Sequence, residues 1–179
     1  KRKKTKWFPY QKGGAYRKWY GNNDYVVDWE NDGYSIKNFY NDKGKLRSRP
    51  QNIQFYCKEG LTWTSLTISS LSMRYVPNGY IFDAKGPMCF PKSSLDIWNI
   101  LGYANSKVID IFLKQLAPTM DYSQGPVGNV PFKFNDGDLN EIIKELVNIH
   151  KRDWDENETS FEFKRDMLVH FSRDINTIK

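Results

Sequence analysis

The sequence predicts a mixed α+β fold in which a β-meander packs against several helices. Two observations predict it. Between residues 53 and 85, short apolar segments with a period close to two alternate with turn residues. After residue 93 the apolar residues adopt helical spacing instead. The chain has 179 residues, of which 39% are hydrophobic, and this is enough for one buried core.

The first part of the chain is expected to form a basic N-terminal arm, a loop and one strand. Residues 1–18 contain eight Lys and Arg and no acidic residue, and residues 11–23 hold three glycines. Residues 24–29 have the β-branched and aromatic content of a strand, which the turn at 31–33 ends. A second turn is expected at 42–45.

The meander is predicted from four short segments with the composition of strands. They are separated by Glu59-Gly60, a Ser/Thr tract and Pro77-Asn78-Gly79. The predicted strands span residues 53–57, 61–64, 72–76 and 80–85.

Helices dominate the second half of the prediction. Two apolar helical stretches lie between residues 95 and 116, with an interruption near residues 102–105. A loop at 121–129 leads into an edge strand at 130–134, which contains a proline, and an amphipathic helix follows at 138–149. We expect residues 1–150 to form the main domain. Residues 151–179 are expected to add an acidic linker and a last helix that opens at Thr159-x-x-Glu162.

Several classes of protein are excluded by what the sequence lacks. It contains no run of ~18 apolar residues and no secretory signal, so we expect a cytoplasmic protein without a membrane association. Cys57 and Cys89 are not part of a C-x-x-C motif, and His150 and His170 have no nucleophile motif near them, so no metal site or catalytic residue is predicted. Because the chain begins without Met inside a basic run, we expect it to be part of a longer polypeptide.

The combination of basic and aromatic residues indicates nucleic-acid binding. Aromatic residues make up 16% of the chain, and the net charge is +6. The candidates for phosphate contacts are Lys12, Arg17 and Lys18. The candidates for contacts to bases or to a groove are Trp19, Tyr20, Arg47, Arg49, Gln51, Asn52 and Arg74. Core packing is the alternative for the two aromatic residues, and a solvated or salt-bridged surface is the alternative for the arginines.

One segment suggests a different chemistry. The predicted strand at 80–85 ends in Asp83-Ala84-Lys85, an arrangement that magnesium-dependent nucleases use to hold a metal and to stabilise charge. Glu59 is the nearest upstream carboxylate. The alternative is a strand whose polar end lies in water.

Several segments resemble one known family. The longest is residues 6–22, followed by 25–33 and 46–52, and the resemblance continues through residues 82–86, 101–107, 128–131 and 160–165. These segments resemble the region behind the catalytic domain in the PglX family, the adenine-specific DNA methyltransferases of BREX phage-defence systems. Two of these segments, Asn105-Ser106-Lys107 at the predicted helix and Gly128-Asn129-Val130-Pro131, are also similar to target recognition domains of type I and type IIG restriction systems. This similarity supports the α+β prediction.

The resemblance implies a function for the region but not a catalytic one. The family's S-adenosylmethionine loop and its Asn-Pro-Pro-Tyr/Phe motif do not occur in this sequence, since Asn129-Val130-Pro131-Phe132 lacks the second proline. The resemblance therefore implies a DNA specificity region of an S-adenosylmethionine-dependent adenine N6-methyltransferase. Its implied partners are double-stranded DNA, the catalytic domain of the same parent chain and other BREX proteins.

Two other functions stay open. The region could be a docking platform for other proteins of the defence system, with the acidic residues 135–179 as the contact surface. It could also be the magnesium-dependent nuclease that Asp83 and Lys85 suggest.

Overall fold

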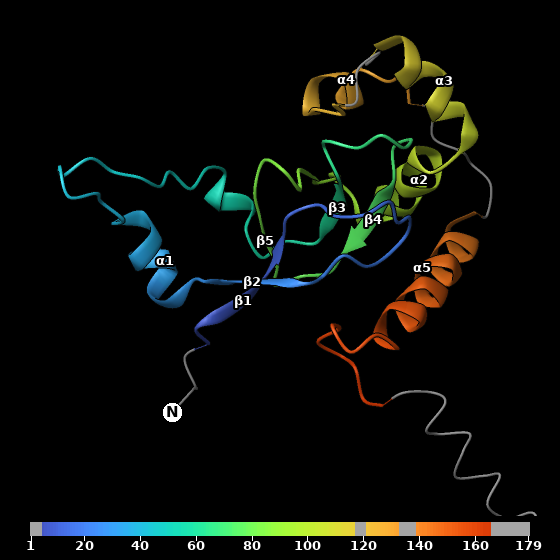
Figure 1. Cartoon of the computed structure of the whole chain (residues 1–179). Helices are drawn as coiled ribbons and strands as arrows, with labels where there is room; N and C mark the ends of the chain where they lie inside the picture. The colour runs from blue at the N-terminus through green and yellow to red at the C-terminus, as the bar shows by residue number, and fades with distance from the viewer. Residues whose placement is uncertain (1–4, 117–120, 133–138, 166–179) are drawn as a thin grey trace, which may run out of the picture.

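Two small sheets and a set of helices form the structure (Figure 1). The computed structural model describes residues 5–116, 121–132 and 139–165. Within these ranges helices and strands are mixed, so the predicted α+β class is confirmed. None of the helices in the described ranges has both the length and the apolar character needed to cross a membrane.

The first sheet has the order β2-β1-β5. β1 (Trp7–Gln11) pairs antiparallel with β2 (Tyr25–Asp28) and parallel with β5 (Ile81–Phe82). The strand expected at 24–29 is thus confirmed, whereas β1 lies inside the segment expected to be a basic arm. The pairing with β5 begins at Tyr10, so Pro9 does not have to donate a hydrogen bond on that side.

The second sheet has the order β4-β3-β6. β3 (Gly60–Trp63) forms an antiparallel pair with β4 (Met73–Val76), and β6 (Met88–Cys89) pairs with the other edge of β3. The strands expected at 61–64 and 72–76 are confirmed. The strand expected at 80–85 is reduced to β5 and joins the first sheet, so the segments do not form one continuous meander.

The strand predicted at 53–57 is wrong. Residues Ile53–Phe55 form the 3₁₀-helix η1, which begins after Asn52 in a left-handed conformation with φ of 59°. The backbone N–H groups of Phe55 and Tyr56 donate to the carbonyls of Asn52 and Ile53 at 2.9 and 3.0 Å. Hydrogen bonds between residues three positions apart define a 3₁₀ turn, and an extended strand cannot form them.

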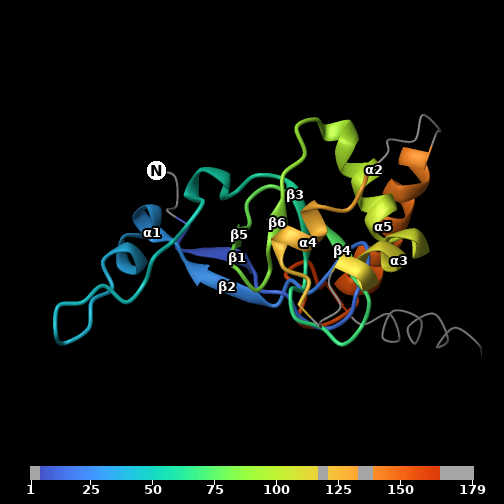
Figure 2. The ribbon, with the colours of Figure 1, turned by 90° about the horizontal axis from the view of Figure 1, so that it is seen from above.

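The helices that follow residue 93 lie around the second sheet, at the end of the molecule away from β1 and β2 (Figure 2), and the first of them packs against β3 and β4. The two apolar stretches form α2 (Ser94–Ala104) and α3 (Lys107–Leu116), as predicted. α4 (Gln124–Gly128) lies within the expected loop. Residues 130–132 are not a strand, and residues 133–134 of that prediction lie outside the described ranges.

The predicted amphipathic helix is confirmed as α5 (Leu139–Asp155), which packs against α2. It continues past residue 150, where the sequence suggested the start of an acidic linker, and Trp154 near its end is buried in the main core. Residues 159–165 form turns and irregular structure, and the rest of the last predicted helix lies outside the described ranges.

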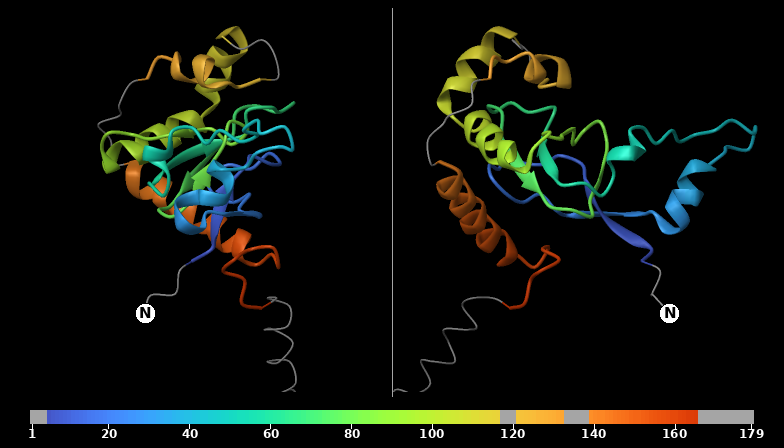
Figure 3. Two further views of the ribbon diagram at one scale, coloured as in Figure 1. Left: turned by 90° about the vertical axis from the view of Figure 1, so that its left-hand side faces the viewer. Right: turned by 180° about the vertical axis from the view of Figure 1, so that it is seen from behind.

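A lobe projects from the side of the first sheet, away from α5 (Figures 1 and 3). We call residues 30–52 the projecting lobe. It contains α1 (Glu30–Lys37), whose first turn holds three left-handed residues at 31–33, and an antiparallel bridge between Tyr40 and Leu46. The turn at 31–33 was predicted, but the helix that follows it was not.

Candidate functional site

The predicted phosphate-binding residues lie on a glycine-rich loop, residues 12–22, that is attached to the second sheet. The backbone N–H of Trp19 donates to the carbonyl of Met73 at 2.9 Å, and the N–H of Tyr75 donates to the carbonyl of Trp19 at 2.8 Å. The loop therefore extends the edge of β4. Gly13 and Gly21, with φ of 85° and 120°, permit the turns at its two ends.

Two of the three predicted phosphate ligands already have partners in the protein. The Arg17 guanidinium lies 2.8 Å from the Asp153 carboxylate and 5.1 Å from the centre of the Trp154 ring. Lys18 Nζ donates to the carbonyl of Asn105, just after the end of α2, at 2.7 Å. Lys12 is exposed and lies over the ring of Tyr25. The loop thus offers one freely accessible cation, because the other two stabilise helix ends.

The two aromatic residues of the loop pack into the protein. Tyr20 is 5% exposed and belongs to the main core, and Trp19 is half-buried against the same core. Burial is also the main reason why the pKa of Tyr20 is raised. In this structure both side chains have the core role that the sequence left open as the alternative.

Arg74 is fully buried, with 0% exposure, and does not reach the surface. Its guanidinium donates to the carbonyls of Arg17 and Ser72 at 3.2 and 3.4 Å and to Thr64 Oγ1 at 3.4 Å, while Nε is buried without a partner in the described residues. Burial lowers the pKa of Arg74 to about 10. Arg74 therefore supports the glycine-rich loop from below, and we do not include it in a binding surface.

The remaining four candidates lie together on the returning segment of the projecting lobe. Arg47, Arg49, Gln51 and Asn52 are all exposed, and their side chains make no hydrogen bond or ion pair within the described ranges. The segment itself is fixed: the Arg47 N–H donates to the Phe39 carbonyl at 2.7 Å, and Ser48 Oγ donates to the Ile36 carbonyl. A fixed backbone thus presents four unengaged polar side chains.

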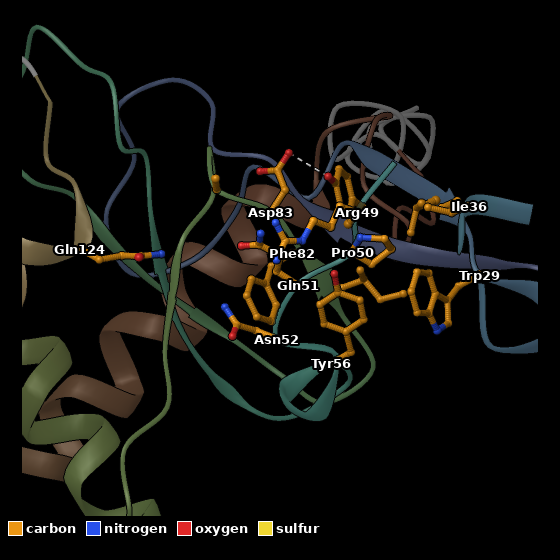
Figure 4. Close-up of a pocket in the computed structure, with 14 residues that line it drawn as sticks. Trp29, Ile36, Arg49, Pro50, Gln51, Asn52, Tyr56, Phe82, Asp83 and Gln124 are labelled. Atoms are coloured by element: carbon orange, nitrogen blue, oxygen red, sulfur yellow. Dashed lines mark hydrogen bonds between the residues drawn. The ribbon is translucent and has the colours of Figure 1, made fainter. Parts of the chain in front are cut away.

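This segment forms one wall of a cavity of about 550 Å³, which we call the lobe pocket (Figure 4). The first sheet contributes Tyr10, Ile81 and Phe82. Arg49, Gln51 and Asn52 line it from the lobe, and Trp29 and Tyr56 supply further aromatic surface. The structure therefore brings three of the predicted base-contacting residues to one concave site.

The aromatic side chains of the lobe pocket hold one another in place. The Tyr56 ring lies edge-on to Trp29 at 5.1 Å and edge-on to Phe82 at 5.2 Å between ring centres. Trp29 and Phe82 are largely buried, whereas Tyr56 is half-buried. Edge-to-face contacts of this kind are a preferred geometry of aromatic pairs, so they favour the ring orientations seen in the wall of the pocket.

Asp83 gives the pocket a fixed negative group. Its carboxylate accepts hydrogen bonds from the Tyr10 hydroxyl at 2.8 Å and from the backbone N–H groups of Lys85 and Gly86 at 2.7 and 3.1 Å. Burial, and then the bond to Asp83, raise the pKa of Tyr10 well above its usual value. Tyr10 is therefore a neutral hydrogen-bond donor at physiological pH.

The nuclease hypothesis gains no support from this geometry. Glu59 accepts a hydrogen bond from the Tyr75 hydroxyl on the second sheet, and Asp83 is engaged as described. Among the residues that the structure describes, no three His, Cys, Asp or Glu side chains cluster as a metal site would require.

Sequence reasoning did not find the other side of the pocket. Tyr10, Trp29 and Tyr56 come from three separate segments, and only the fold brings them to Arg49 and Gln51. Their aromatic character was visible, but nothing in the local pattern indicated that these particular rings share a cavity.

Comparison with known proteins supports the resemblance seen in the sequence. No protein-family model matches the chain. It is 37% identical over 167 residues to the adenine-specific methyltransferase BrxX of Escherichia coli O9:H4 (strain HS), a match that covers 92% of this chain and 13% of that protein. It is 38% identical over 165 residues to the adenine-specific methyltransferase PglX of Lacticaseibacillus casei (strain Zhang), covering 91% of this chain and 14% of that protein. The resemblance to PglX methyltransferases is thereby confirmed, and the chain spans about one seventh of the length of these relatives.

Proposed function

We propose that this chain is the DNA specificity region of an adenine-specific N6-methyltransferase of a BREX phage-defence system. In this proposal the region has no turnover of its own, and a catalytic domain elsewhere in a cytoplasmic parent chain binds S-adenosylmethionine. Similarity to two adenine-specific methyltransferases over more than nine tenths of the chain supports the connection with methyl transfer.

The observation that carries the specificity role is the row of unengaged side chains from Arg47 to Asn52. Arginine and amide side chains are the groups that read base edges through paired hydrogen bonds. Here they are exposed, make no side-chain hydrogen bond or ion pair with any residue that the structure describes, and sit on a segment whose backbone is held in place. Residues 38–52 also carry four basic residues and one acidic residue, so the lobe can approach phosphates.

The glycine-rich loop has a smaller part in this proposal than the sequence suggested. Lys12 is available for a phosphate, whereas Arg17 and Lys18 would have to give up their contacts with Asp153 and Asn105. Trp19 and Tyr20 would act by holding the loop on the core rather than by touching DNA.

The decisive experiment exchanges this region between two parent enzymes with different target sequences. We expect the methylated sequence, mapped across the genome, to follow the exchanged region. An unchanged methylation pattern from an active chimaera would overturn the specificity role.

A second experiment locates the interface on this chain. Replacing Arg47 or Arg49 with Ala should weaken binding to the target duplex by about 1–3 kcal/mol for each lost base contact and relax the preference at one position of the target sequence. Lys107→Ala, which removes an exposed cation from α3, is the matched control and should leave that preference unchanged. Equal effects of all three substitutions would contradict a lobe-centred interface.

A docking role is the second candidate, and it is favoured by apolar side chains on the helices. Val108 and Ile111 of α3 are 50% and 63% exposed, and Ile142 of α5 is 53% exposed. Because the relatives are about seven times longer than the matched region, we propose that the rest of the parent chain packs against the exposed apolar side chains of α3. Ile111→Glu in the intact parent should then loosen the region and lower methylation, whereas Gln115→Glu on the same helix should not.

A further inference from the structure

We propose that the lobe pocket binds a single nucleobase that has been unstacked from its neighbours. This inference rests on the proposed DNA-binding function and names the ligand of one part of that surface. It concerns a base held by the specificity region, separate from the adenine that receives the methyl group.

The volume of the lobe pocket is large enough for one nucleoside. Its volume of about 550 Å³ lies within the range of about 300–1,000 Å³ that is usual for small-molecule sites. It is bounded by the sheet on one side and by the segment from Arg49 to Asn52 on the other (Figure 4). A single base could therefore enter between two walls that belong to distant parts of the chain.

The aromatic wall supplies a stacking surface. Tyr10 and Tyr56 are only half-buried, and edge-on contacts with Trp29 and Phe82 fix the Tyr56 ring. Stacking of a base on an aromatic side chain contributes about 1–3 kcal/mol and does not depend strongly on base identity. An ordered tyrosine gains this energy without first having to be immobilised.

The polar groups of the pocket suit the edge of a base. The Gln51 and Asn52 amides each combine a donor and an acceptor, and neither has a partner within the described ranges. Such amides form paired hydrogen bonds with base edges. The left-handed backbone of Asn52 and the two hydrogen bonds of η1 fix the position from which these side chains extend.

The charges in the pocket favour a base over a phosphate group. Asp83 lines the same cavity as Arg49, and three hydrogen bonds hold its carboxylate in place. A phosphate beside Asp83 would experience repulsion between like charges in a partly desolvated site. A neutral base avoids this repulsion and can donate an amino or imino hydrogen to the carboxylate, while Arg49 remains available for the backbone at the pocket mouth.

Nuclear magnetic resonance titration of this chain with nucleosides tests the proposal directly. Adenosine, guanosine, cytidine and thymidine are each added at millimolar concentration, with inorganic phosphate as the control ligand. We expect at least one nucleoside to shift the side-chain amide signals of Gln51 and Asn52, and phosphate to leave them unchanged. The variant Gln51→Ala/Asn52→Ala should weaken nucleoside binding about tenfold or more, and Lys107→Ala, at an exposed position of α3, should not.

A duplex experiment distinguishes a DNA base from a free nucleotide. A duplex with one mismatched base should bind more tightly than the paired duplex, because a mismatched base costs less to unstack. This preference should disappear in Gln51→Ala/Asn52→Ala. Failure of every nucleoside to shift the pocket signals, or a preference for the mismatch that survives in the variant, would overturn the pocket proposal.

The two proposals fail separately. If the chain binds duplex DNA in a salt-dependent way but no nucleoside shifts the pocket signals, the proposed specificity role stands and the proposed nucleobase pocket is wrong. Tight binding of a free nucleotide that duplex DNA does not displace would also overturn this inference, because the ligand would then not come from DNA.

Discussion

The guanidinium of Arg17 lies 2.8 Å from the carboxylate of Asp153, although 136 positions separate the two residues in the chain. This contact joins the glycine-rich loop to the end of α5. Arg17 also lies over the ring of Trp154, which is buried in the core. A residue that the sequence suggested as a phosphate ligand is therefore part of the connection between two elements of the fold.

The first prediction separates the two contacts of Arg17. Asp153→Ala removes only a partly exposed ion pair and should lower the free energy of unfolding by less than about 1 kcal/mol. Arg17→Ala also removes the contact with Trp154 and should cost roughly 1–2 kcal/mol. Urea unfolding of the two variants and of the double variant measures both costs. Equal costs for the two single substitutions would show that the contact with Trp154 contributes nothing.

The second prediction concerns the titration of His150, which lies near the same ion pair. Burial and then the charge of Arg17 lower its pKa, while Asp153 opposes them. Because the pKa is lower in the folded protein than in the unfolded chain, the unfolded chain binds the proton more tightly. The contribution of His150 to the free energy of unfolding should therefore fall as the pH drops from about 6.5 through the pKa of the folded state.

Variants of the ion pair check the cause of the His150 shift. Arg17→Ala should raise the pKa of His150, and Asp153→Asn should lower it further, as measured by nuclear magnetic resonance titration of the imidazole. A His150 pKa that does not respond to either substitution would leave burial as its sole cause.

Helices with apolar residues at regular helical spacing could be predicted from the sequence, because this spacing places those residues on one buried face. In α5, Ile143 and Val147 are buried at helical spacing, so the sequence located this helix correctly. β1 was missed because the basic residues around Trp7–Gln11 masked a short strand of mostly aromatic character. The segment from Ile53 has the residues of a strand, but the left-handed Asn52 before it begins a 3₁₀ turn.

Burial of polar side chains was harder to predict than the elements themselves. Met73, Arg74 and Val76 are all buried, so both faces of β4 are covered. Alternation of polar and apolar residues along this strand therefore could not show that Arg74 is buried. Arg47 and Arg49 lie in a polar segment away from the apolar pattern, and both side chains are exposed. The lobe pocket depends on contacts across the sheet that no local pattern encodes.

The third prediction concerns stability at alkaline pH. Burial, followed by the hydrogen bond to Glu59, raises the pKa of Tyr75, and burial also raises the pKa values of Tyr10 and Tyr80. Above pH of about 10 the unfolded chain loses these protons while the folded protein keeps them. The stabilisation is thus complete below pH of about 10 and is lost as the pH rises toward the raised values.

Tyr75→Phe provides the check. At neutral pH it should cost about 1 kcal/mol, since one hydrogen bond is lost. It should also make the loss of stability above pH of about 10 less steep, because one titrating group is gone. Urea unfolding across this pH range measures the stability of both proteins, and phenolate absorbance reports the ionisation of the tyrosines. An equal loss of stability in the unsubstituted protein and in Tyr75→Phe would contradict the prediction.

The last prediction asks what the buried charge of Arg74 does. Its guanidinium holds Thr64 and the carbonyl of Arg17, but no ion pair to it exists within the described ranges. Arg74→Lys keeps the buried charge and loses the forked geometry, so it should destabilise the fold by about 3 kcal/mol. Arg74→Met removes the charge with a side chain of similar length and should cost less, because only hydrogen bonds are lost. Chemical unfolding of both variants gives the order. The reverse order would mean that the fold needs a positive charge at this position, which would require an anionic partner beneath the glycine-rich loop.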